Sequence, residues 1–173
     1  MNDNELIAAL RVKAANVESR APASIAALER TEATLGFSID PFLRRVYLEV
    51  GNGAVGPGYG TLPLEGEESL ASTYTNVFTD DWPKELLPVW NWGDAIWSCV
   101  DAAGRVVTTD DVGEPMLTDF TTRTWLRAWV DGVHLWNELF DDKEVTLLNP
   151  FTRKPVTTKA RNIVKGRPWV PQR

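Results

Sequence analysis

The 173-residue chain has the length of one domain, and its 43% hydrophobic and 24% charged residues are ordinary for a globular protein. Its formal net charge of −6 argues against a surface that holds nucleic acid phosphates and favours basic protein partners, unless the charge serves only solubility. The single cysteine, Cys99, excludes an intramolecular disulfide and a zinc site built from cysteines.

No segment of the sequence has the pattern of an export signal or a membrane span. Residues 1–5 contain no basic stretch leading into an apolar run, and no stretch approaches 18 continuous apolar residues. A lone thiol also suits a reducing compartment. We therefore expect a cytoplasmic protein with no membrane partner.

Helical spacing of apolar residues predicts three helices in the first part of the chain. The first covers residues 4–18. The second runs from Pro22, which suits a first helical position, to Gly36, which suits the position after a last turn. The third is capped by Asp40 and ends at Gly51.

The pattern then changes to short runs of aromatic and β-branched residues, which predict strands. The predicted strands cover residues 61–64, 86–92, 95–100, 105–109 and 115–120, with a short helix around residues 70–78. Helical spacing returns over residues 121–131 and 135–140. This order predicts an α+β fold, with a central mostly antiparallel sheet flanked by N-terminal helices and a C-terminal helix.

The last part of the chain differs from the rest in charge. Residues 149–173 carry seven basic residues and no acidic one, whereas residues 1–148 carry 11 basic and 24 acidic residues, a net charge of −13. We therefore expect one domain over residues 1–148 and a basic C-terminal arm over residues 149–173, extended or partly disordered.

A glycine-rich loop follows the third predicted helix and spells G-x-G-x-x-G from Gly51 to Gly56. A dinucleotide site needs a strand before this motif and a helix after it, but here a helix precedes it and Pro57 follows. The glycines instead predict a tight helix-to-strand connection with unusual backbone angles. The structural residues of this loop are Gly51, Asn52, Gly53, Gly56, Gly58 and Gly60.

No constellation of residues indicates catalysis, a metal ion or a cofactor. Cys99 lies within a predicted strand, which favours a buried inert thiol. His134, the only histidine, closely follows a helix-ending glycine, and we expect a local structural role for it. Adjacent acids lack calcium-loop spacing and predict caps and turns. These pairs are Asp80-Asp81, Asp110-Asp111 and Asp141-Asp142.

Eight tryptophans are unusual for this length, and six of them lie between Trp82 and Trp129. In a strand, Trp90 and Trp92 point to the same face. Such a pair serves either a core or a recognition surface, and the core is favoured because each buried ring removes a large apolar area from water. Trp125 is expected in the core together with Trp129.

Several short motifs, taken in order, resemble the SUKH superfamily, also called the Smi/Knr-like domain. The motifs are Leu35-Gly36-Phe37, Pro41 opening a helix, Gly51-Asn52-Gly53, Gly56 to Gly60, Leu87-Pro88, Trp92-Gly93, Ser98 to Asp101, Gly104 to Val106 and Trp125 to Gly132. The resemblance covers about residues 24–140. It implies an α+β fold without a catalytic residue set. Asp94 departs from the family, in which cysteine often follows the glycine.

The resemblance implies an immunity protein that binds a polymorphic toxin, often a nuclease, and neutralises it as a stoichiometric inhibitor. The alternatives are a regulatory interaction scaffold, as in fungal relatives, and a small ligand-binding domain that uses the glycine-rich loop. Acids and aromatics near the sheet would face a toxin with a basic surface. These expected partner-binding residues are Tyr59, Glu65, Glu67, Glu68, Asp80, Asp81 and Trp82. The oligomeric state stays open, with a monomer favoured.

Overall fold

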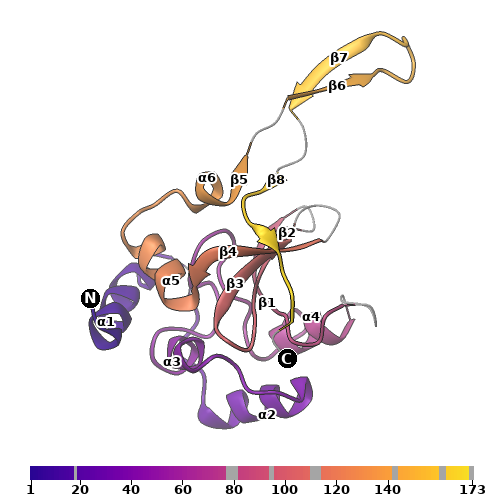
Figure 1. Ribbon diagram of the computed structural model, residues 1–173. Helices are drawn as coiled ribbons and strands as arrows, with labels where there is room; N and C mark the ends of the chain where they lie inside the picture. Colours follow the sequence, from indigo (N-terminus) through magenta and orange to yellow (C-terminus); the bar gives the residue numbers. More distant parts are fainter. Residues whose placement is uncertain are drawn as a thin grey trace.

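The computed structural model describes residues 1–17, 19–76, 82–93, 96–109, 114–141, 144–159 and 163–171. The helices within these ranges are α1 (Asp3–Ala14), α2 (Ile25–Leu35), α3 (Pro41–Glu49), α4 (Leu70–Asn76), α5 (Thr122–Val130) and α6 (Leu135–Leu139). The helices α1, α3 and α5 lie side by side (Figure 1). None of the described helices combines the length and the apolar character that crossing a membrane requires.

Side-chain hydrogen bonds set the ends of the N-terminal helices. Asp40 caps α3 as the sequence predicts. The helix α2 begins after Ser24, whose hydroxyl accepts the N–H of the third helical residue at 3.1 Å, so the predicted start at Pro22 is wrong. The helix α1 ends at Ala14 rather than at residue 18, and the Ser19 hydroxyl donates to the Ala14 carbonyl at 3.0 Å.

The strands are β1 (Leu87–Gly93), β2 (Ile96–Val100), β3 (Arg105–Thr109), β4 (Pro115–Thr121), β5 (Phe140–Asp141), β6 (Glu144–Leu148), β7 (Pro155–Lys159), β8 (Ile163–Val164) and β9 (Arg167–Pro168). Among the described residues they form an antiparallel sheet in the order β1-β2-β3-β4-β9 and the pairs β5-β8 and β6-β7. The predicted α+β class is confirmed.

The strand predicted over residues 61–64 is only a single bridge, between Thr61 and Trp90. Pro63 has no N–H to donate to a strand ladder, and the next N–H along the chain bonds instead to the Asn52 side chain at 2.8 Å. This segment therefore crosses the edge of β1 and turns back onto the glycine-rich loop.

Alternating side chains of β2 divide the core between the two faces of the sheet. Ile96 and Val100 lie in the larger cluster, where the sheet packs against helical residues. Trp97 and Cys99 face the other way, into a smaller cluster. The fully or nearly buried members of that smaller cluster are Leu86, Cys99, Val107, Leu117 and Trp169. Both faces of the sheet are thus covered.

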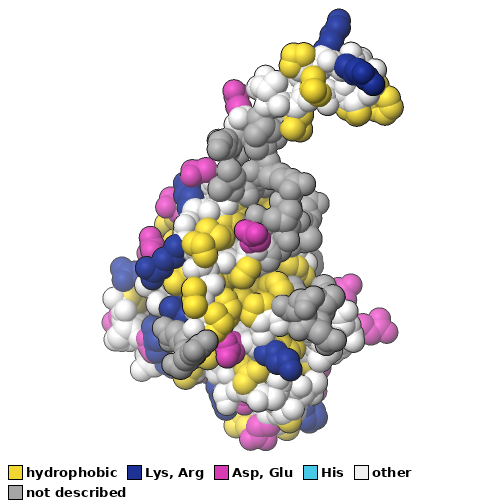
Figure 2. Space-filling model, turned by 45° about the vertical axis from the view of Figure 1, so that its right-hand side comes forward, with side chains coloured by type: hydrophobic (Ala, Val, Ile, Leu, Met, Phe, Trp, Pro, Cys, Tyr) yellow, Lys and Arg dark blue, Asp and Glu magenta, His cyan; other side chains and the backbone are white. Residues whose placement is uncertain are grey.

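The basic C-terminal segment begins in a projecting hairpin and returns to the main sheet. Strands β6 and β7 form the hairpin, which extends away from the body (Figure 1) and stands clear of it in the second view (Figure 2). The boundary expected after residue 148 lies at its turn, where Leu148 pairs with Pro155. Further on, β9 pairs with β4, and Trp169, only 8% exposed, donates from Nε1 to the Asp101 carboxylate at 3.2 Å.

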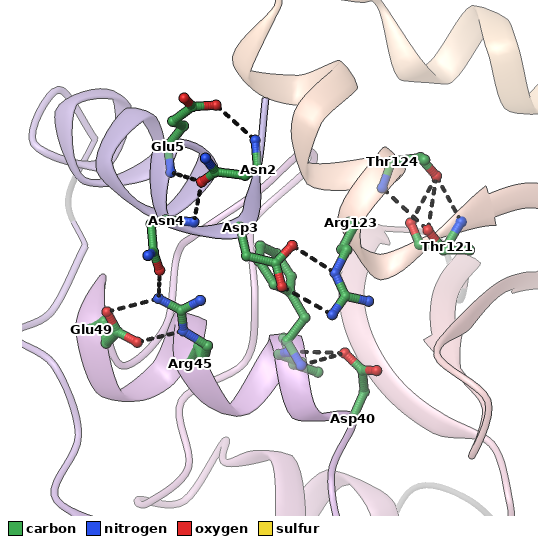
Figure 3. A network of polar contacts seen from close by, with 12 residues as sticks. Asn2, Asp3, Asn4, Glu5, Asp40, Arg45, Glu49, Thr121, Arg123 and Thr124 are labelled. Carbon is green, nitrogen blue, oxygen red and sulfur yellow. Dashed lines mark hydrogen bonds and ion pairs between the residues drawn. The ribbon is translucent and has the colours of Figure 1, made fainter.

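A polar network fastens the N-terminus to α3 and α5 (Figure 3). The Arg123 guanidinium donates to both carboxylate oxygens of Asp3, at 2.9 and 3.1 Å, and Arg45 donates to Asn4 at 2.9 Å and to Glu49 at 2.7 Å. These hydrogen bonds hold the pKa of Asp3 and the pKa of Glu49 below their ordinary values. The network is therefore structural, because its acids are already paired.

Candidate functional site

The glycine-rich loop is held rigidly against β1. The indole Nε1 of Trp90 donates to the Val55 carbonyl at 3.1 Å, and the Tyr59 N–H donates to the Asn91 carbonyl at 3.0 Å. The Asn52 carboxamide joins the loop to the segment that follows it. The loop is thus a connection with defined hydrogen-bond partners.

Close approach explains why two positions of this loop are glycine. At Gly58 the backbone has φ of +63°, and a Cβ would lie 2.6 Å from the Asn91 carbonyl oxygen. At Gly51 the φ lies outside the left-handed region, so the unusual backbone angle expected for the glycines of this loop does not explain this glycine. A Cβ there would lie 3.0 Å from the carbonyl oxygen of Arg20 and 3.3 Å from a methyl group of Val55.

An open groove of about 400 Å³ lies between this loop and the chain that follows it. Its lining residues are Arg20, Gly53, Ala54, Tyr59, Gly60, Thr61, Leu62, Pro63, Glu68 and Asn91. The walls combine backbone of the glycine-rich loop, apolar Leu62 and Pro63, and the charged residues Arg20 and Glu68. The groove therefore offers both an apolar surface and charges of both signs to a bound molecule.

Tyr59 is the exposed aromatic residue of the groove, with 74% of its surface accessible. Its backbone is fixed by the hydrogen bond to β1, and its ring lies close to Gly93, where a Cβ would stand 3.6 Å from the ring. A large ring on a rigid backbone loses little conformational freedom when a partner covers it. Tyr59 is therefore well placed as an anchor for a bound protein.

The expected acidic residues differ in what they contact. Glu65 forms an ion pair with Arg30 and so is partly neutralised. Glu67 and Glu68 are exposed, and neither forms an ion pair within the described part of the chain. Asp80 and Asp81 lie outside the described residues. The structure thus brings Glu68 and Tyr59 together in one groove, with Glu67 adjacent in sequence.

Trp82, also expected as an anchor, lies elsewhere. It is half-buried, packs against the smaller core cluster, and donates from Nε1 to the Leu86 carbonyl at 2.9 Å. Trp82 therefore packs on the face of the sheet that carries the smaller cluster, and it does not line the groove.

The tryptophans of β1 serve the core more than the surface. Trp90 is fully buried, and its ring lies 5.5 Å from that of Trp125, which is also fully buried. Trp92 is half-buried between Trp125 and Trp136, with ring centroids 6.0 and 5.6 Å away. Trp129, expected in the core, is only half-buried, with the Lys13 ammonium 5.0 Å from its ring centre.

Among the described residues, Cys99 and His134 are not arranged for a chemical step, and the acids Asp80, Asp81, Asp110, Asp111 and Asp142 lie outside the described residues. Cys99 is fully buried, and burial raises the pKa of its thiol far above the ordinary value, which disfavours the reactive thiolate. His134 is exposed at the start of α6 and makes no capping hydrogen bond through its side chain. Within the described ranges, no group of three or more histidine, cysteine or acidic residues is placed to hold a metal ion.

Two groove residues, Arg20 and Asn91, have no signal in the sequence. Arg20 lies in the connection between α1 and α2, and Asn91 lies in the middle of β1. The Asn52 N–H lies 3.3 Å from the Arg20 carbonyl and so brings that connection to the loop. Such a contact between distant segments has no periodic pattern by which sequence analysis would find it.

Comparison with known proteins adds no relative. The chain matches no family model, no curated protein and no solved structure.

Proposed function

We propose that this chain is an immunity protein of the SUKH type, which binds a basic protein toxin in the cytoplasm and neutralises it as a stoichiometric inhibitor. The observation that carries the proposal is the groove beside the glycine-rich loop. There the exposed Tyr59 and Glu68 line one groove, and Glu67 precedes Glu68 in sequence; both acids are exposed and have no ion pair in the described part of the chain.

Charge supports a basic partner. Residues 1–148 have a net charge of −13, which accelerates encounter with a positively charged protein. A nuclease toxin must hold phosphates, so it presents basic side chains that Glu67 and Glu68 complement. Within the described ranges these two carboxylates form no ion pair that would have to break before they bind, unlike Glu65, which is paired with Arg30.

Rigidity supports binding rather than a moving catalytic site. The loop backbone is fixed by Trp90 and by Asn91, so little ordering is needed when a partner docks. The buried Cys99 and the exposed His134 offer no activated nucleophile. In this proposal inhibition follows from occupying a surface of the toxin, without a chemical step.

A second candidate is a small-ligand site in the same groove. Its volume of about 400 Å³ lies within the usual range for such sites, and Arg20, Glu68 and Asn91 would provide polar contacts. A regulatory scaffold of the Smi/Knr type would use the same exposed residues. A higher melting temperature with one compound of a small-molecule panel, and no such rise with a protein partner, would favour the ligand-binding function.

The test uses the protein encoded by the gene next to this one, the expected position of a toxin gene. We expect a one-to-one complex that abolishes the toxin's activity. The variant Glu67→Lys/Glu68→Lys should reduce the association rate roughly tenfold or more at low salt, because the attraction becomes repulsion. The variant Glu29→Lys/Glu138→Lys is the matched control, with the same charge change at two exposed acids on α2 and α6.

Two results would overturn the proposal. Inhibition at a chain-to-toxin ratio far below one would indicate enzymatic inactivation. Equal association rates for the groove variant and its control would place the interface elsewhere.

A further inference from the structure

The hairpin of β6 and β7 is a separate projecting feature of the molecule (Figure 1). Its ladder runs from Glu144 opposite Lys159 to Leu148 opposite Pro155. In the described part of the chain, these two strands pair only with each other. An isolated two-stranded hairpin is marginally stable in water, so this one would be stabilised by a partner.

Apolar side chains gather on this hairpin. Phe151 is 93% exposed and Leu148 is 71% exposed, and Leu147 and Val156, which are opposite each other in the ladder, are about half exposed. Leu147 and Val156 lie on one face of the hairpin, Leu148 lies on the other, and Phe151 lies in the turn, so this small projecting element exposes apolar side chains on both faces and at its tip, as interaction sites do.

The tip of the hairpin is ordered by its own hydrogen bonds. The Asn149 side chain accepts the N–H groups of Phe151 at 2.9 Å and Thr152 at 3.0 Å, and the Arg153 N–H donates to the Asn149 carbonyl at 2.8 Å. Arg153 adopts a φ of +54°, which is unfavourable for a residue with a side chain. The turn therefore holds Phe151 outward in a defined position.

The charge of the tip selects the chemistry of its partner. Arg153 and Lys154 are exposed beside Phe151, and residues 149–173 contain no acid. Figure 2 shows Lys and Arg side chains together with hydrophobic ones on the arm, away from the body. The arm therefore fits an acidic protein surface, and it does not fit the basic toxin of the proposed function.

We infer that the β6–β7 hairpin docks onto the acidic body of a second copy of this chain. Each copy has both complementary parts. Outside the hairpin, residues 1–143 and 160–173 carry 15 basic and 23 acidic residues, a net charge of −8, whereas the projecting hairpin, residues 144–159, carries three basic residues and one acidic residue, a net charge of +2. Two copies exchange arms symmetrically, which makes the contact twice and closes the assembly as a dimer. This differs from the monomer that the sequence favours, and it does not depend on the proposed function.

The negative charge of the body favours a second copy of the chain over other acidic partners of the hairpin. A nucleic acid or an anionic membrane is negatively charged over an extended surface. The acidic body next to the hairpin is therefore repelled by such a surface. A second copy brings its own arm to offset that repulsion. Oligomeric state is therefore the direct readout.

The experiment is sedimentation velocity of the full chain over a range of concentrations. We expect a species of twice the 19.3 kDa chain mass at about 0.15 M salt and dissociation at about 1 M salt, where the screening length falls from about 8 to 3 Å. Phe151→Ser and Lys154→Glu should each weaken dimerisation at least tenfold. Their matched controls, Val12→Ser and Lys84→Glu, change an exposed residue of the body in the same way and should not.

A cross-linking measurement locates the contact. Cys99 is buried and is the only cysteine, so a photo-cross-linker attached to Thr152→Cys is confined to the tip of the arm. It should join residues of the second copy that lie outside its own hairpin. A monomer at every concentration, a dimer that the two tip variants leave intact, or cross-links from arm to arm only would each overturn the inference. Binding of monomers to vesicles of anionic lipid or to single-stranded DNA through Phe151 would also overturn it.

Discussion

Trp169→Ala tests whether the end of the chain belongs to the folded domain. Trp169 is 8% exposed, fills the smaller core cluster, and donates from Nε1 to Asp101. Removing a buried tryptophan of this kind costs about 3–5 kcal/mol, from lost apolar burial and from the cavity left behind. Asp101 keeps its hydrogen bonds from Arg105, so the loss of one donor adds little.

Urea unfolding followed by tryptophan fluorescence and circular dichroism measures this loss. The midpoint should fall with little change in the slope, because the surface exposed on unfolding stays similar. Val170→Ala is the matched control at a neighbouring residue that is 68% exposed, and it should change stability by less than about 0.5 kcal/mol. A loss below about 1 kcal/mol for Trp169→Ala would refute the inclusion of residues 163–171 in the core.

Three further predictions concern the loop, the polar network and the absence of a chemical step. Gly58→Ala should lower stability by more than about 1 kcal/mol, seen as a lower melting temperature, because its φ is positive and a Cβ would approach Asn91. Because Arg123 lowers the pKa of Asp3, their pairing stabilises the fold above the ordinary value of 3.8 and is lost as the pH falls through the lowered value. Asp3→Asn should therefore flatten stability against pH in acid, and an unchanged acid profile would refute this role. Cys99→Ala and His134→Gln should leave toxin neutralisation intact in folded protein, and lost neutralisation without unfolding would indicate chemistry.

Local chemistry made most of the fold predictable. Asp40 before a proline and Gly36 after an apolar run mark helix ends whatever packs against them, and the structure has helix ends at both. Alternation along β2 likewise predicts two buried faces, which Ile96 and Cys99 occupy. Each of these signals lies within a few neighbouring residues.

The C-terminal segment was harder to predict because its structure depends on distant partners. Its prolines and basic residues are typical of an extended arm, yet β9 pairs with β4 and Trp169 reaches Asp101 across 68 positions of sequence. The candidate groove shows the same division. Tyr59 and Glu68 are near each other in sequence, whereas Arg20 and Asn91 join them only through the tertiary fold.

Amide hydrogen exchange on the chain with and without its toxin shows whether the toxin covers the groove. If the toxin binds in the groove, exchange becomes slower on binding over residues 52–68 and around Asn91. Slower exchange confined to the β6–β7 hairpin, with the groove unchanged, would contradict it.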